Sequence, residues 1–502
     1  MKQLRELEAS FLALETPTQT GHVASLAIYD VPEGAEDSVF PALTRALAPR
    51  IARRAALRQR LVPVPLELDL PYWIEDRAFE LDYHLRHSRV PWPGRDAQLA
   101  ELVARLHGRP LDRTRPLWEM EVIEGLEGGR FALYTKVHHA ALDRLGSIAL
   151  LEALADGASA VQDEDEETER EIRVPGALEL LARAALGASG RPRRALLRFA
   201  RLAAAVVRSG NVGGVATASG LLPFAHAAGL GRVPGLYRAL GIERDRAGES
   251  ESALPATPAP RTPWNRAISA HRRWTGFTLP LADVGRVKHA FGVAANAVVL
   301  ALAAHALRRE LAIRRELPDD PMLALVPVVL GTASDDGPAR YASIALTDLA
   351  TDEPDPAERL LRIDRALRSA RRGHEGIPAE LVRELGHIGA GVLAGPARRA
   401  LARTGLAERM RPPFTVWVSN TVGPRRALEL AGAPLRALFP LSIVTDGQGL
   451  HVSAISYGDG LHFGLTACRS LVPEVAELGQ GFEEGLAELC KRAKARTARV
   501  VH

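Results

Sequence analysis

Two adjacent histidines, His138 and His139, have the residue type and setting best suited to chemistry in this 502-residue chain. They follow the stretch RFALYTKVH, residues 130–138, which is rich in strand-forming residues. Asp143 comes four residues after His139. An imidazole has an ordinary pKa of about 6.5, so at a strand end facing a cleft it can exchange a proton near neutral pH. The pattern predicts a general base, with Asp143 fixing the turn or orienting the imidazole or a nearby arginine.

Other catalytic sites fit the sequence less well. A metal site needs a third ligand, and no HExxH pattern supplies one. A serine-type triad needs a nucleophile in a recognisable context, and the chain has no GxSxG, P-loop or CxxC. A lone base acting on a bound hydroxyl needs only the imidazole. From this stretch alone, a purely structural His-His pair remains the alternative.

Composition and charge narrow the class of protein. The chain is 47% hydrophobic and 25% charged, as in ordinary globular proteins, and its length favours two or more domains. Lys plus Arg is 64 and Asp plus Glu is 60, so the net charge is only +4, and aromatic residues are 5%. Nucleic acid is therefore not an expected partner. Two cysteines, Cys468 and Cys490, favour a reducing cytoplasm. No signal peptide or long apolar run is found, which predicts a cytoplasmic protein that is soluble or peripherally attached to a membrane.

The periodicity of apolar residues predicts the elements that must position the histidines. The predictions are helices at 4–14, 97–107 and 291–311, strands at 22–30, 130–138 and 321–330, and a hairpin of 450–457 with 461–466. The order of these elements suggests two mixed α/β halves of comparable size.

The region between the halves has a different composition. Residues 161–173 carry seven acids, which predicts a solvated loop. Residues 191–208 carry six arginines and no acid, typical of a basic amphipathic helix on an anionic membrane surface. The alternative is a helix whose arginine stems cover the protein's own core. The sequence ALPATPAPRTP, ending near residue 263, predicts an interdomain linker.

The stretch RPLDRTRPLWEMEVIEGLEGGRFALYTKVHHAALD, residues 109–143, resembles the bacterial wax ester synthase/diacylglycerol acyltransferase family, which is marked by PLW(E) and then HHxxxDG. The resemblance continues along almost the whole chain. WVSNTVGP, residues 417–424, resembles the family's SNxxGP motif, and SYGDGLHFGLT, residues 456–466, resembles its C-terminal hairpin.

The resemblance implies the fold of coenzyme-A-dependent acyltransferases such as chloramphenicol acetyltransferase. This is an α/β (α+β layered) fold of two lobes with mixed sheets, a helical linker and an active-site channel between them. The implied domains are an N-terminal lobe at 1–160, a connecting region at 161–260 and a C-terminal lobe at 261–502. The implied reaction transfers an acyl group from acyl-CoA to diacylglycerol or a long-chain alcohol, with no metal or other cofactor. The implied location is the cytoplasm, at the inner membrane or lipid bodies.

The resemblance also implies roles for individual residues. His139 matches the family's general base, His138 is given a supporting role, and Asp143 is chiefly structural. The candidate oxyanion donors are Asn296, Ser419 and Asn420. Trp118, of the PLWE motif, either lines the acyl channel or packs in the core.

The chain departs from the family at three motif positions. Arg144 replaces the glycine of HHxxxDG, Ala297 replaces the aspartate of the Asn-Asp motif, and residues 338–343 read PARYAS where Gly-Asn is expected. Arg144 would be strained if the backbone there had φ > 0. The departures leave two alternatives open: a catalytically impaired lipid-surface binding protein, or an acyltransferase for a different acceptor.

Overall fold

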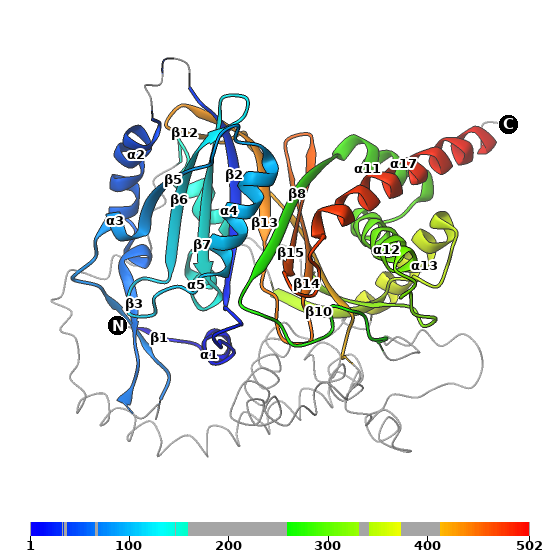
Figure 1. Ribbon diagram of the computed structural model, residues 1–502, viewed down its shortest axis with the longest axis horizontal. Helices are drawn as coiled ribbons and strands as arrows, with labels where there is room; N and C mark the ends of the chain where they lie inside the picture. Colours follow the sequence, from blue (N-terminus) through cyan, green and yellow to red (C-terminus); the bar gives the residue numbers. More distant parts are fainter. Residues whose placement is uncertain are drawn as a thin grey trace.

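The computed structural model describes residues 2–32, 34, 38–65, 69–145, 147–158, 259–330, 341–372 and 412–500. These residues form two lobes side by side, each built on a six-stranded sheet (Figure 1). The α/β fold class with mixed sheets and two lobes is confirmed. The acidic stretch 161–173 and the arginine-rich stretch 191–208 lie outside the described residues.

The N-terminal sheet has the strand order β12-β13-β2-β7-β6-β5. Its inner strands are β2 (His22–Asp30), β7 (Arg130–His138) and β6 (Trp118–Leu126), and β5 (Leu85–Arg89) lies at one edge. Apolar side chains bury both faces of the sheet. The core on one face includes residues of α2 (Phe40–Ala52), α5 (His139–Leu145) and α6 (Ser147–Leu154), and α4 (Asp96–Gly108) packs on the other. The strands predicted at 22–30 and 130–138 are confirmed.

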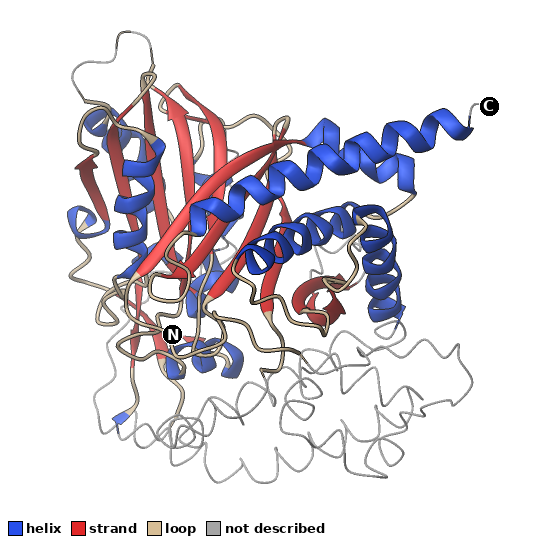
Figure 2. Ribbon diagram, turned by 45° about the vertical axis from the view of Figure 1, so that its right-hand side comes forward, coloured by secondary structure: helices blue, strands red, loops and turns tan. Residues whose placement is uncertain are grey.

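The C-terminal sheet has the strand order β10-β9-β11-β14-β15-β8. Its strands are β8 (Arg272–Pro280), β9 (Leu323–Leu330), β10 (Tyr341–Asp348), β11 (Val416–Val422), β14 (Leu450–Tyr457) and β15 (Gly460–Cys468). Four helices surround its core: α11 (Leu281–Phe291), α12 (Ala295–Ile313), α13 (Pro356–Arg372) and α17 (Val475–Val500). Figure 2 shows the long α17 running across one side of the strands. The predicted hairpin of β14 and β15 is confirmed.

The apolar helix predicted at 291–311 starts later than expected. Gly292 adopts a left-handed conformation, with φ of 67°, and ends α11. Helix α12 then begins at Ala295. The prediction was wrong here because the apolar pattern runs through a break that only the backbone conformation reveals.

One segment of the C-terminal half crosses into the N-terminal sheet. Strands β12 (Glu429–Leu430) and β13 (Ala433–Leu441) follow β11 in sequence, yet β13 pairs antiparallel with β2 of the N-terminal sheet. The segment expected to build only the C-terminal lobe therefore contributes residues 429–441 to the other sheet. At the junction the backbones nearly touch, since a Cβ on Gly464 would lie 1.8 Å from the carbonyl oxygen of Pro440.

Small elements complete the N-terminal lobe. A three-stranded sheet contains β1 (Lys2–Gln3), β3 (Gln59–Val62) and β4 (Tyr72–Glu75), and the short helices are α1 (Glu6–Ala13), α3 (Leu81–His84) and the 3₁₀ turn η1 (Ala55–Arg58). In the described part of the chain, no single helix has the length and apolar composition of a membrane span. Helices α11 and α12 meet that criterion only as a pair bent by 106°.

Candidate active site

His139 lies where β7 ends and α5 begins. Its backbone N–H donates to the carbonyl of Gly21 at 2.8 Å, and its ring stacks on Phe11 of α1 with 4.3 Å between ring centroids. Burial, with further contributions from His138 and His451, lowers the pKa of His139 to about 3. The imidazole is therefore neutral at physiological pH and free to accept a proton.

His138 is buried behind this ring and is held by a carboxylate. Its Nδ1 accepts a hydrogen bond from the backbone N–H of Ala140 at 3.0 Å, so the neutral ring carries its proton on Nε2. That Nε2 lies 3.1 Å from Oε1 of Glu15. Glu15 also accepts from the backbone N–H of Gly21 and from the guanidinium of Arg113.

The pKa of Glu15 reflects these contacts. Burial alone would raise it, but the hydrogen bond and electrostatic interaction with His138, the Gly21 amide and Arg113 together lower it to about 2. The segment between α1 and β2 thus fixes the histidine pair with a permanent negative charge.

A cavity of about 200 Å³ lies between the two lobes beside α5. Leu142 reaches it from α5, about one helical turn after the predicted base His139, which is not itself among the described residues that line the cavity. The other residues that line it come from α6 and from strands of both sheets: Val23, Ala24, Ser25, Ile148, Leu151, Ser419, Thr421, Leu438, Pro440, Leu441, Ser442, Ser453, Ala454 and Ile455. The lining is mostly apolar with a few hydroxyls, which suits a hydrocarbon chain that carries one polar reacting group.

Hydroxyl groups of the C-terminal lobe form a chain along one wall of this cavity. Ser419 Oγ donates to Ser453 Oγ at 3.0 Å, and Ser453 Oγ lies 2.8 Å from Ser442 Oγ. Ser419 Oγ also lies 3.3 Å from Nε2 of His451, whose Nδ1 donates to the carbonyl of Ile443. Burial lowers the pKa of His451 to about 4, so its Nε2 is an acceptor near neutral pH. The predicted donor Ser419 therefore lies on the cavity wall next to His451, and His451 in turn contributes to the lowered pKa of His139.

Comparison with known proteins decides the family. A profile of the wax ester synthase/diacylglycerol acyltransferase catalytic domain matches residues 4–299, and that of the family's C-terminal domain matches residues 341–490. The chain belongs to the wax ester synthase/diacylglycerol acyltransferase family. The resemblance seen in the sequence motifs is thus confirmed.

Relatives of this family match over nearly the full length. A putative diacylglycerol O-acyltransferase of Mycobacterium tuberculosis is 33% identical over 96% of this chain and 98% of its own. The O-acyltransferase WSD of Acinetobacter baylyi is 30% identical over 96% of both chains.

Solved structures show the same fold. The wax ester synthase/diacylglycerol acyltransferase of Marinobacter aquaeolei VT8 matches with a TM-score of 0.68 and 27% identity, over 98% of this chain and all of that one. The first condensation domain of the calcium-dependent antibiotic synthetase matches with a TM-score of 0.53 and 17% identity, over 97% and 96% of the two chains. The second match bears on the fold alone.

Within this family member, the other predicted donors lie away from the cavity. Asn420 follows Ser419 in β11, and Ser419 and Thr421 line the cavity, so Asn420 faces the opposite side of the sheet. Asn296 is the second residue of α12, and its buried Oδ1 has no hydrogen-bond partner among the described residues. Asn296 does not line the described cavity either. Of the three predicted donors, the structure brings only Ser419 to the cavity.

Trp118 is a core residue. It is fully buried, its Nε1–H donates to the carbonyl of Leu57 at 2.7 Å, and its ring stacks on His84 with 4.6 Å between centroids. It does not line the described cavity between the lobes. This placement favours the packing role over the lining role.

Two of the three family departures fall on described backbone within helices. Asp143 and Arg144 lie within α5, so Arg144 has a right-handed backbone and the strain expected for φ > 0 does not arise. Their side chains lie outside the described structure. Ala297 is fully buried in the core of the C-terminal lobe. Of 338–343, residues 341–343 belong to β10 and the rest lie outside the described residues.

Sequence reasoning missed Glu15 and the wall formed by His451, Ser453 and Ser442. The sequence did contain a signal for two of these residues, His451 and Ser453. In the strand LHVSAISY, His451 and Ser453 are polar residues two positions apart among apolar ones, which places both on one face. Glu15 carried no comparable signal, because nothing in FLALETPTQTG shows that its carboxylate reaches a histidine 123 positions later.

Proposed function

We propose that this protein transfers a fatty acyl group from acyl-CoA to the hydroxyl of diacylglycerol or a long-chain alcohol, with His139 as general base. The observation that carries the proposal is a largely apolar cavity between two lobes, lined by Leu142 about one helical turn after the neutral imidazole of His139. The names of the mycobacterial and Acinetobacter relatives support the same reaction class.

The reaction follows from the arrangement of the groups. His139 takes the hydroxyl proton as that oxygen attacks the thioester carbon. The tetrahedral intermediate then expels the CoA thiolate, which takes the proton back from the imidazole and leaves as free CoA. A well-placed base contributes about 10²–10⁴ to such a rate.

Ser419 is the proposed donor to the oxyanion. Its hydroxyl proton points toward Ser453 in the structure, and rotation about Cβ–Oγ redirects it into the cavity. Ser453 Oγ, 3.0 Å away, can then donate its own proton to Ser419 Oγ and hold that oxygen in place. Loss of one oxyanion donor costs about 10²–10³ in rate in other acyl-transfer enzymes.

No metal or other cofactor enters this scheme, because the thioester already provides an activated carbonyl. We also propose that the protein works at a lipid surface, where its water-insoluble acceptors collect. The six arginines of residues 191–208 support this second point. Sedimentation with anionic and with neutral vesicles tests this point. Binding to neither kind of vesicle would contradict it.

The decisive experiment follows release of the CoA thiol from acyl-CoA, with an acceptor panel of diacylglycerol, long-chain alcohols, small polar alcohols and amines. His139→Ala should lose ester formation by at least about 10². Wild-type ester formation by His139→Ala would refute the assigned base. If the protein binds vesicles but releases no thiol from acyl-CoA with any acceptor, it is a binding protein. If it turns over only small acceptors, these replace the proposed substrate class.

A further inference from the structure

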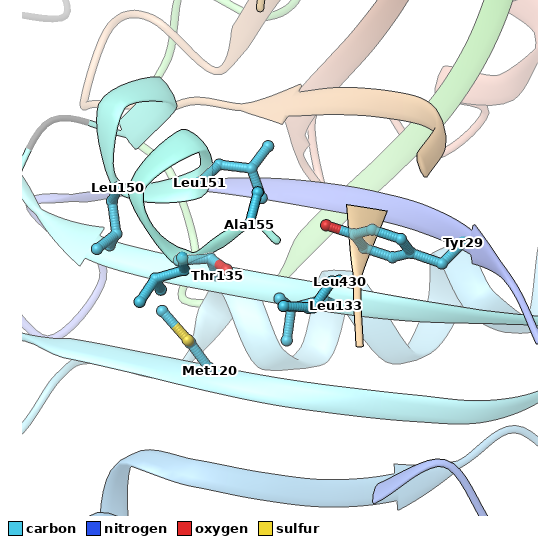
Figure 3. A pocket seen from close by; sticks show the side chains of 9 residues that line it. Tyr29, Met120, Leu133, Thr135, Leu150, Leu151, Ala155 and Leu430 are labelled. Atoms are coloured by element: carbon cyan, nitrogen blue, oxygen red, sulfur yellow. The ribbon is translucent and has the colours of Figure 1, made fainter. Parts of the chain in front are cut away.

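Helix α6 contributes side chains to two apolar spaces, one between the lobes and one inside the N-terminal lobe. The first is the cavity of about 200 Å³ between the lobes, which Ile148 and Leu151 line. The second is a void of about 10 Å³, which Leu150, Leu151 and Leu154 line. Figure 3 shows Leu150 and Leu151 on this helix above the strands that form the floor of the void. Among the described residues, Leu151 alone lines both spaces.

The small void is a mostly apolar space. Apart from Thr135 and the hydroxyl of Tyr29, its lining is hydrocarbon and thioether: Met120, Leu133, Leu150, Leu151, Leu154, Ala155 and Leu430. A space of about 10 Å³ holds at most one water molecule. The side chain of Leu151 lines both this void and the large cavity, so its removal is the change expected to join the two spaces.

We propose that Leu151 is a specificity-determining residue that limits the length of the hydrocarbon tail bound in the large cavity. The inference rests on the proposed function, because it assigns a substrate tail to that cavity. Leu151 is 6% exposed and belongs to the lobe's core, so it forms a fixed wall and not a mobile surface group. The tail belongs either to the acyl group or to the acceptor, and both are hydrocarbon chains.

The test is Leu151→Ala, which removes three carbons from the wall. Initial rates are measured with a length series of acyl-CoA at one fixed alcohol, and with a length series of alcohols at one fixed acyl-CoA. We expect the optimum of one series to move longer by about three methylenes, with about fourfold gained per added methylene in competition between neighbouring lengths. The series that moves identifies the tail.

Leu150→Ala is the matched control. Leu150 is also a buried leucine of α6, but it lines only the small void, so its loss enlarges that void and leaves the wall intact. Both variants should lose thermal stability to a similar degree, and only Leu151→Ala should change the preferred length. If Leu151→Ala does not fold, Leu151→Val replaces it, and the preferred chain length should then increase by about one methylene. Length profiles identical in the Leu151 and Leu150 variants, in both series, overturn the proposal.

Binding of a length series of alkyl-CoA thioethers, which cannot react, separates this inference from the proposed function. If the wild type releases no thiol with any acceptor, the proposed reaction is wrong, while calorimetry with the thioethers still reports whether Leu151→Ala admits a longer tail. If Leu151→Ala shows no gain in affinity for longer thioethers, and its length profiles with acyl-CoA and with alcohols are also unchanged, Leu151 does not limit the length of the tail.

Discussion

Glu15→Gln tests whether a buried carboxylate fixes the histidine pair. The substitution keeps the shape of the side chain and removes its charge. Glu15 faces Nε2 of His138 at 3.1 Å, and it accepts hydrogen bonds from the Gly21 amide and from Arg113. Its side chain is 11% exposed, so solvent screens these contacts only weakly.

The pKa of Glu15 sets the magnitude. Its lowering from 4.5 to about 2 corresponds to about 3 kcal/mol of preference for the charged form in the folded protein. A depressed carboxyl pKa stabilises the folded state above the unfolded-state value, and this stability is lost as pH falls from 4.5 toward 2. At pH 7, Glu15→Gln should therefore lower the free energy of unfolding by up to about 3 kcal/mol.

Urea unfolding of wild type and variant at pH 7 and at pH 4 measures the effect. The difference between the two proteins should be largest at pH 7 and smaller at pH 4. Glu483→Gln, at an exposed position of α17, is the control and should change stability by less than about 0.5 kcal/mol. A loss at pH 7 no larger than that of the control, or a difference that grows as pH falls, would show that Glu15 does not act as a charged anchor.

Three further predictions follow from contacts elsewhere. Burial lowers the pKa of His107 to about 3, so the unfolded chain binds this proton first, and His107 by itself should lower the stability by about 2 kcal/mol from pH 7 to pH 5. His107→Phe should flatten that part of a thermal-unfolding pH profile, and an unchanged slope would contradict it. Buried Arg272 donates to the carbonyl of Thr18 across the lobes at 2.6 Å. Arg272→Ala should lower the free energy of unfolding in urea by about 1.5–3 kcal/mol and lower the rate of CoA release. Intact activity would argue against a role for this contact between the lobes. Gly464→Ala would place a Cβ 1.8 Å from the carbonyl oxygen of Pro440, so the lobes must separate and the melting temperature should drop, whereas an unchanged melting temperature would refute the close approach.

Local pattern predicted the elements whose sequence signal is local. The strands at 22–30 and 130–138 and the C-terminal hairpin carry strand-forming residues bounded by turn residues, and the structure has all three where expected. The boundary near residue 292 failed, because apolar periodicity does not register a single left-handed glycine between two helices.

The candidate site divides in the same way. His139 is identifiable from sequence because its neighbours, the preceding strand and the following helix, are contiguous with it. Ser419 was named from a motif, but its neighbour Asn420 was named with it, and only the strand's alternation tells the two apart.

The sequence by itself determined that this chain forms two α/β halves and presents a histidine at a strand end. Only the tertiary structure decided what meets that histidine. The contact of Glu15 with His138 and the crossing of β13 into the other sheet join residues separated by more than a hundred positions, and the wall contact of Ser419 with His451 joins residues 32 positions apart. Such contacts depend on sheet pairing and on burial shared between lobes, and neither leaves a periodic trace in the local sequence.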